Sequence, residues 1–249
     1  MPTSLEDMRL ELGAAMASAG PGLSAANALC EACVDLLGVD GAAISMIHSG
    51  LSHGTFGASS DSSRRLDEYQ FTFGEGPCLD AANSRTAVLA PDLDSPDEAR
   101  WPAFTEAVLG DGIRAVFALP INITSSCVGA LDLFRTGPGP LPRSHLAGGM
   151  LAAELASLPM MDLIASTQRH PVDEDDDPWA QLAELDRVEV YQATGILISQ
   201  LDVDATEALV RLRAHAISTN RTASQVAIDI IERRVVLERD HQDDNGRNP

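Results

Sequence analysis

The segment Gly74-Glu75-Gly76-Pro77-Cys78 is where residue types and spacing in this 249-residue chain point most directly to chemistry. Its two glycines permit backbone angles that are closed to other residues, and Pro77 suits the first position of a helix. Cys78 would then lie in the first helical turn, where the helix dipole lowers the pKa of a thiol. Such a cysteine serves as a redox sensor or chromophore attachment point, or simply as a small buried residue that fixes the turn.

The remaining reactive side chains form no recognisable catalytic or metal-binding pattern. The cysteines have no repeated spacing, which argues against a disulfide framework or a zinc module: Cys30, Cys33, Cys78 and Cys127. Cys30 and Cys33 share one face of a predicted helix and are expected in a core. The histidines are dispersed, and the sequence contains neither GxxxxGK nor GxSxG. We therefore expect no metal site and no enzyme.

A polar stripe is expected near the C-terminus, because Gln192, Gly195 and Ser199 are spaced i, i+3 and i+7 on a predicted helix. Their amide and hydroxyl groups can hydrogen-bond phosphates or base edges. A glycine inside a helix costs about 1 kcal/mol, so Gly195 needs a reason, either close approach of a nucleic-acid backbone or close packing of a helix. Arg211 and Arg213 are about 200° apart around a helix and cannot serve one surface together.

The elements that would position these residues fall into two groups, separated by an acidic segment over residues 169–178. Two prolines there bracket the run Asp-Glu-Asp-Asp-Asp, whose charges repel one another, so we interpret the segment as a linker. An alternative is that it lies over an arginine-rich face. Predicted domains are an N-terminal domain over 1–168, this linker, a helical domain over 179–239 and a disordered tail over 240–249.

The first group mixes helices and short strands, which predicts an α+β fold with an antiparallel sheet and helices on one side. Helical apolar spacing covers 5–19, 25–37 and 142–165, with shorter helices over 76–83 and 102–109. Pro159 should break or kink the last long helix. Strands are predicted over 42–48, 54–58, 86–90, 115–123 and 128–134.

The second group reads as an all-α bundle of three amphipathic helices. The first covers about 179–201 with an apolar stripe, and the second and third begin at the capping patterns Asp204-Ala-Thr-Glu207 and Thr222-Ala-Ser-Gln225. The expected buried residues are Leu182, Leu185, Ala193, Ile196 and Leu197, then Ala205, Ala208, Leu209, Leu212 and Ala216, then Val226, Ala227 and Ile230. A bundle this small buries little surface, so we expect it to form a homodimer or to dock on the preceding helix.

Charge and hydropathy limit the cellular setting. The net charge of −20 argues against nucleic acid, but residues 182–239 are nearly neutral, and every one of the 17 basic residues is arginine. No apolar run reaches the roughly 18–20 residues that span a bilayer, and the N-terminus lacks a signal pattern, so we expect a cytoplasmic protein without membrane contact.

The first group resembles a GAF domain over about residues 20–165. The resemblance rests on the order of elements around the segment Phe71–Ala81, the strand with Val88-Leu89-Ala90-Pro91-Asp92, and the strand Gly129-Ala130-Leu131-Asp132-Leu133. It implies a sensor that holds a small ligand between sheet and loops, with Phe73, Glu75 and Cys78 as ligand-binding candidates. The sequence does not select the ligand or a cofactor.

The second group resembles an ANTAR domain over about 180–235. The matching residues are Val190-Tyr191-Gln192-Ala193-Thr194-Gly195-Ile196-Leu197-Ile198, Asp204–Ala208, Leu212-Arg213 and Thr219-Asn220-Arg221. The resemblance implies a dimeric module that binds paired RNA stem-loops in nascent transcripts and prevents transcription termination. It assigns RNA contacts to Gln192, Thr194, Gly195, Ser199, Arg213, Asn220 and Arg221. The family usually has lysine where this chain has Thr194, so this position brings no charge to a phosphate.

Together the two resemblances imply a ligand-responsive, RNA-binding transcription antiterminator. The combination of a GAF domain with an ANTAR domain is known in actinobacterial proteins. A three-helix module can also present a recognition helix to DNA. Residues 222–231 contain no arginine and one aspartate, which argues against that alternative. A third interpretation is a sensor or interaction module that binds no nucleic acid.

Overall fold

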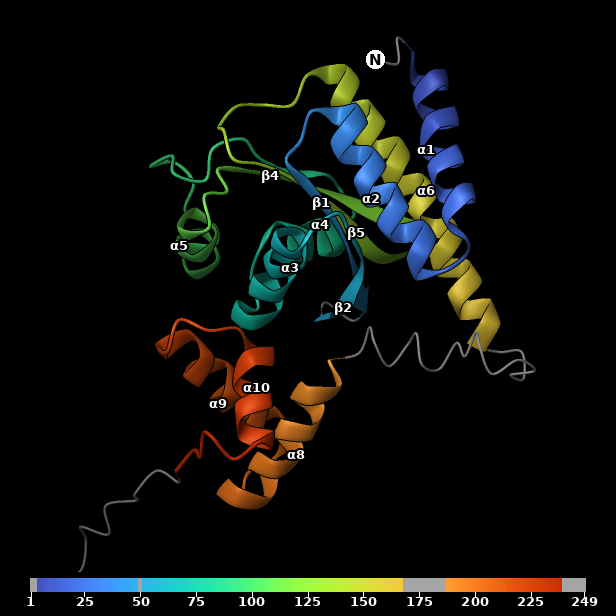
Figure 1. The fold of residues 1–249 in the computed structure, drawn as a ribbon. Helices are drawn as coiled ribbons and strands as arrows, with labels where there is room; N and C mark the ends of the chain where they lie inside the picture. Colours follow the sequence, from blue (N-terminus) through green and yellow to red (C-terminus); the bar gives the residue numbers. More distant parts are fainter. Residues whose placement is uncertain (1–3, 49–50, 168–186, 239–249) are drawn as a thin grey trace, which may run out of the picture. The chain divides into compact units, whose positions relative to one another are not determined.

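The computed structural model describes residues 4–48, 51–167 and 187–238 (Figure 1). Two compact units divide the chain, residues 1–186 and 187–249, and each is described by itself. The predicted linker over 169–178, the predicted tail over 240–249 and the predicted helical residues 179–186 lie outside the described residues.

A five-stranded antiparallel sheet forms the centre of the first unit (Figure 1). Its order is β2-β1-β5-β4-β3, with the strands β1 Gly41–His48, β2 Leu51–Ala58, β3 Val88–Ala90, β4 Ala115–Ile123 and β5 Ser126–Arg135. The predicted antiparallel sheet is confirmed. Helices cover both of its faces, so the expectation of helices on one side only is wrong.

One face of the sheet packs against α2 (Leu23–Leu37) and α6 (Arg143–Thr167), and α1 (Leu5–Ala19) packs on these two helices. Alternate strand residues such as Ile44, Leu119 and Leu131 point into this layer and are fully buried or nearly so. Cys30 and Cys33 on α2 are fully buried in the same core, as the sequence predicted. Their burial raises the pKa of Cys33 to about 12 and that of Cys30 well above its ordinary value, so both thiols stay protonated.

Helix α6 continues through Pro159, which the sequence analysis expected to break or kink it. Buried neighbours on both sides of the proline, Ala156, Met160 and Leu163, hold the helix against the core. This packing offsets the roughly 3 kcal/mol that an interior proline costs a helix.

Residues 143–163 of α6 are also long and apolar enough to cross a membrane by length and composition, which corrects the expectation of no such run among the described residues. Half of the most apolar window is buried inside the unit. The buried half packs against α2 and the sheet, whereas the side chains of Met150, Leu158 and Met161 are exposed.

The other face of the sheet carries α3 (Asp61–Phe73), α4 (Pro77–Ser84) and α5 (Pro102–Gly110). Helix α3 was not predicted, because its buried positions are mostly polar and give no apolar periodicity: Ser63, Leu66, Asp67, Gln70, Phe71 and Thr72. Its boundaries were nevertheless readable from the caps. The Ser60 hydroxyl accepts from the Ser63 amide, and Gly74 ends the helix in the left-handed conformation.

The second unit is a three-helix bundle of α8 (Val188–Leu201), α9 (Ala205–Ser218) and α10 (Ala223–Ile231). Both predicted N-caps are confirmed, since the side chains of Asp204 and Thr222 accept from the backbone three residues on. The buried residues are Val190, Ala193, Leu197 and Leu201, then Ala208, Leu212 and Ala216, then Ala223, Val226, Ala227 and Ile230. Two expected core positions are wrong, because Ala205 is exposed and Ile196 is 40% exposed, and a third, Leu209, is only half-buried.

Gly76 should be the least replaceable glycine around α4. It has φ +145°, and a Cβ there would lie 2.4 Å from Oε1 of Gln70. Gly76→Ala should therefore lower the free energy of unfolding of the first unit by at least about 2 kcal/mol, measured by urea titration.

Gly13→Ala is the matched control, since a Cβ on this α1 residue meets nothing within 4 Å. It should raise stability by about 0.5–1 kcal/mol. Equal effects of the two substitutions would contradict this account of Gly76.

Candidate functional site

The predicted polar stripe exists on α8: Gln192, Gly195 and Ser199 are all exposed. A Cβ built on Gly195 meets nothing within 4 Å. Close packing inside this unit therefore does not require a glycine at this position. The glycine nevertheless lowers the stability of the helix. The structure leaves the stripe open for a ligand or partner.

Thr194 is separated from this stripe. The residue is partly buried, and its hydroxyl donates to the carbonyl oxygen of Val190 at 2.7 Å. This hydrogen bond to the preceding turn of the helix uses the only proton of the Thr194 hydroxyl. Thr194 can accept a hydrogen bond from a ligand, but it can no longer donate one.

Large apolar side chains flank the stripe, which the sequence analysis did not anticipate. Val188, Tyr191 and Ile198 are exposed by 38%, 58% and 36%, and together with Gly195 they recur at i, i+3, i+7 and i+10. The sequence candidates for RNA contact did not include Tyr191. Its position next to Gln192 was the signal that could have identified it. An exposed ring of this kind can stack on an unpaired base.

Asn220 has a structural explanation at the end of α9. It adopts φ 52°, in the left-handed region. Its amide donates to Ile217 and the Arg221 amide donates to Ala216, the two hydrogen bonds of a Schellman motif. Asparagine tolerates this conformation better than most residues, so its presence does not require an RNA contact.

Arg213 lies partly buried on α9, near Arg187 at the start of α8, which is 5% exposed. Burial, and secondarily the charge of Arg187, lower the pKa of Arg213. Arg211 lies elsewhere on the helix and pairs with Glu207 at 2.7 Å. The structure therefore keeps the two arginines in different surroundings, as their spacing predicted.

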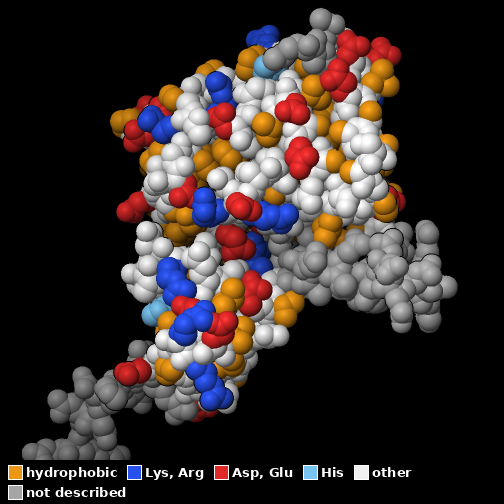
Figure 2. Space-filling view, in the orientation of Figure 1, with side chains coloured by type: hydrophobic (Ala, Val, Ile, Leu, Met, Phe, Trp, Pro, Cys, Tyr) orange, Lys and Arg blue, Asp and Glu red, His pale blue; other side chains and the backbone are white. Residues whose placement is uncertain are grey.

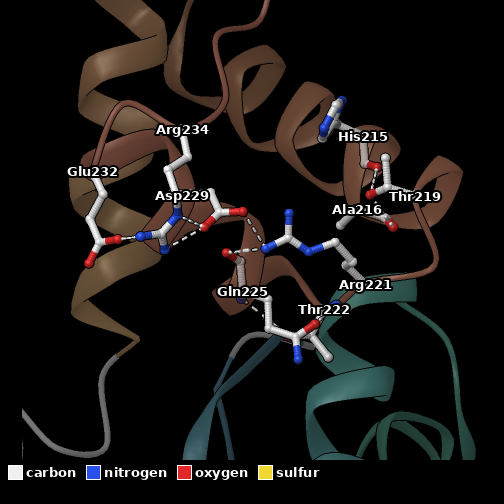
Figure 3. A network of polar contacts seen from close by, with 9 residues as sticks. All are labelled: His215, Ala216, Thr219, Arg221, Thr222, Gln225, Asp229, Glu232 and Arg234. Carbon is white, nitrogen blue, oxygen red and sulfur yellow. Dashed lines mark hydrogen bonds and ion pairs between the residues drawn. The ribbon is translucent and has the colours of Figure 1, made fainter.

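Arg221 belongs to a network of polar contacts around α10 (Figure 3). Its Nη2 lies 2.6 Å from Oδ2 of Asp229 and donates to the carbonyl of Gln225 at 3.0 Å. The other carboxylate oxygen of Asp229 accepts from Nε of Arg234 at 2.6 Å. Hydrogen bonds from Arg234 and then Arg221 hold the pKa of Asp229 below its ordinary value.

The surface of this unit is mixed in charge. Figure 2 shows basic and acidic side chains interleaved over α9 and α10 on the face in view, with apolar side chains between them. This distribution agrees with the near-neutral count for residues 182–239. A ligand of this surface would be held by specific contacts more than by a continuous basic patch.

In the first unit, Glu75 caps a helix. Its Oε1 accepts from the amides of Ala103 and Phe104 at 2.8 and 3.0 Å, in the first turn of α5. Phe73 is half-buried and stacks on Tyr69, with ring centroids 5.9 Å apart. Both predicted ligand-binding residues therefore have defined contacts within the protein.

Cys78 lies in the first turn of α4 after Pro77, as predicted, and its side chain is fully buried. Its amide donates to Oε1 of Gln70 at 2.7 Å. Nε2 of Gln70 in turn donates to Oδ2 of Asp132 on β5 at 2.6 Å. One amide side chain thus joins α3, α4 and the sheet.

Two fully buried carboxylates lie near this amide, and sequence reasoning missed both. Asp67 on α3 accepts hydroxyl hydrogen bonds from Ser45, Thr55 and Ser52, with Thr55 at 2.6 Å. Burial, opposed by the Gln70 hydrogen bond and reinforced by the charge of Asp67, raises the pKa of Asp132 to about 8. Asp132 therefore carries a proton at neutral pH. Among the described residues no group of three or more metal-ligating side chains could hold a metal ion.

Family models match both units. The GAF domain model matches residues 23–158, more than half of the chain, and the ANTAR domain model matches residues 180–231. The chain belongs to the GAF family. More particularly, it is a regulator that combines a GAF domain with an ANTAR domain, and both are regulatory rather than catalytic domains.

Solved structures support the fold of the first unit. The GAF domain of an Acinetobacter phosphoenolpyruvate-protein phosphotransferase has a TM-score of 0.51 at 12% identity, covering 68% of this chain and 100% of that one. The corresponding GAF domain from Coxiella burnetii has a TM-score of 0.50 at 16% identity, covering 66% and 97%. No curated protein matches the chain.

The raised pKa of Asp132 should make the first unit less stable as pH rises. Between about pH 4 and 8 the folded protein keeps a proton that the unfolded chain releases, so stability falls by up to about 1.4 kcal/mol per pH unit through this window. Asp132→Asn retains a neutral side chain of similar shape and should abolish this slope. Urea unfolding at pH 6, 7 and 8, followed by tryptophan fluorescence, measures it.

Asp35→Asn is the control, because this α2 carboxylate is exposed. It should keep the wild-type slope. An Asp132→Asn variant whose stability falls with pH as steeply as wild type would refute the assignment.

Proposed function

We propose that this regulator is a transcription antiterminator, whose C-terminal unit binds stem-loop RNA in response to a small molecule sensed by the N-terminal unit. The observation that carries the proposal is the exposed stripe Gln192, Gly195 and Ser199, inside the region that the ANTAR model matches. Gly195 is a helical glycine with open space before it. An RNA backbone approaching α8 gives this glycine a reason that packing within the unit does not.

Recognition in this proposal depends mainly on loop bases rather than on phosphates. Gln192 and Ser199 supply hydrogen-bonding groups, and the exposed ring of Tyr191 supplies a stacking surface. Because base contacts outnumber phosphate contacts in this proposal, few counterions would be released on binding. We therefore propose a shallow dependence of affinity on salt.

The sensing step is proposed for the face of the sheet that carries α3, α4 and α5. The turn 74–78 connects these three helices, through Gln70 and Glu75. A ligand that engages Glu75 would remove the cap from α5, and one that reaches Cys78 would disturb the Gln70 hydrogen bonds. The proposed assembly is a homodimer that binds two adjacent stem-loops.

The direct test is to sequence RNA that copurifies with the full chain and to measure its binding to the purified protein. Duplex DNA of random sequence is added as competitor. Retention of one class of paired stem-loops, undisplaced by DNA, would support the proposal. Displacement of the RNA by DNA would favour a DNA-binding regulator. If the protein bound no RNA at low salt, the antiterminator assignment would be refuted.

Gly195→Ala separates the proposed RNA contact from a structural role. Alanine should raise the stability of the second unit by about 1 kcal/mol, since its methyl meets nothing, while it weakens RNA binding by up to about tenfold. Thermal melting and titration with the copurified RNA measure the two effects. Gly13→Ala, which also stabilises a helix but in the other unit, should leave affinity unchanged.

If Gly195→Ala left affinity unchanged while it raised stability, the stripe would not be an RNA contact.

A further inference from the structure

Asp229 holds two arginines that come from opposite ends of the helix on which it lies. Arg221 precedes α10 and Arg234 follows it, yet each contacts one oxygen of the same carboxylate, at 2.6 Å in both cases (Figure 3). Asp229 is only 14% exposed, whereas Arg221 and Arg234 are 31% and 56% exposed. The carboxylate is therefore the inner member of the cluster and the guanidinium groups are the outer members.

The backbone fixes both arginines in place. Arg221 follows Asn220 in the Schellman motif that ends α9, and Thr222 next to it begins α10 with a complete capping box. Arg233 takes the left-handed conformation after α10, with φ 59°. The Arg234 amide then donates to the carbonyl of Asp229 at 2.7 Å, which closes a second motif of the same kind.

The cluster retains unused guanidinium donors for a ligand. In the part of the chain that the structure describes, both contacts of Arg221 use Nη2, so Nε and Nη1 are left over. Both guanidinium groups contact the Asp229 carboxylate, which is 14% exposed, and Glu232 pairs with Arg234 from the solvent side, so two carboxylates balance the two arginines. Planar guanidinium groups held in a fixed geometry suit the oxygens of a phosphate.

We propose that Asp229 positions Arg221 and Arg234 as a pair that binds one phosphate of the RNA backbone. The proposal rests on the RNA-binding function proposed above. It adds Arg234, which was not among the sequence candidates, and gives Arg221 a defined partner. Asp229 touches no RNA in this account and acts only through the two arginines.

The sign of one substitution distinguishes positioning from general electrostatics. Removing a carboxylate beside a polyanion should strengthen binding if charge alone matters, because one repulsive charge is lost. If Asp229 positions the arginines, its removal releases two long side chains, and binding should weaken. The two explanations therefore predict opposite changes in affinity.

The experiment uses the full chain with Asp229→Asn and the RNA that copurifies with wild type, transcribed in vitro. We expect the dissociation constant to rise at least fivefold. Asp202→Asn is the matched control, because it removes an exposed carboxylate at the end of α8 in a left-handed conformation that asparagine tolerates. This control should bind as well as wild type or better.

Arg234→Ala supplies a test that leaves the Arg221–Asp229 pair in place, and it decides the matter if Asp229→Asn fails to fold by circular dichroism. We expect about fivefold weaker binding and a salt slope that is shallower by up to about 0.7, the value for a whole phosphate contact on a single strand, because Arg221 keeps part of the shared contact. The double variant Asp229→Asn, Arg234→Ala should have a dissociation constant within about twofold of that of the weaker-binding single variant.

Folded Asp229→Asn that binds as tightly as wild type or more tightly would overturn the proposal, as would Arg234→Ala with unchanged affinity and salt slope. In both cases RNA binding by wild type would remain intact, so the proposed function would stand. Failure of the wild-type chain to retain RNA would instead remove the proposed function itself.

Discussion

The side chain of Gln70 is the contact on which the architecture of the sensor face depends. Its amide nitrogen donates to Asp132 in the sheet, and its amide oxygen accepts from the backbone of Cys78 at the start of α4. Both bonds are buried, where an unpaired polar group costs about 1–3 kcal/mol. The position of α4 on the sheet is therefore fixed by an interaction that tolerates little change in geometry.

Several residues follow from this constraint. Gly76 must lack a side chain because Gln70 passes 2.4 Å from where its Cβ would be. Asp132 stays protonated because burial, reinforced by the charge of Asp67, raises its pKa to about 8. Glu75, next to Gly76, points to the start of α5 and caps it. The motif that looks like a reactive turn in the sequence is thus the junction of three helices.

Sequence reasoning succeeded where a residue pattern reports directly on local backbone geometry. The caps at Asp204 and Thr222 and the strand over 115–123 were placed correctly because a capping pattern and a short apolar run are local signals. Helix α3 was not predicted because its buried face is mostly polar and has no apolar period. The residues that this face contacts lie on strands distant in sequence. For the same reason Asp67, Gln70 and Asp132 could not be grouped as one network before the fold was known.

The candidate interface was predictable in position more than in role. Helical spacing placed Gln192, Gly195 and Ser199 on one exposed stripe. Resemblance alone could not show that Asn220 ends a helix or that the Thr194 hydroxyl donates to the carbonyl of Val190. Those roles depend on dihedral angles and on hydrogen bonds that a motif does not encode.

Strands β4 and β5 connect the two helix layers of the sensor unit. Ala118 and Ala130 face α4, whereas their neighbours Leu119 and Leu131 face the layer that contains α6. Gly149 of α6 allows close approach, since a Cβ there would lie 2.8 Å from the Leu119 side chain. Close-packed interiors transmit displacement rather than absorb it. A shift of α4 relative to these strands would therefore alter the surface on which α6 packs, and α6 is the last described helix before the second unit.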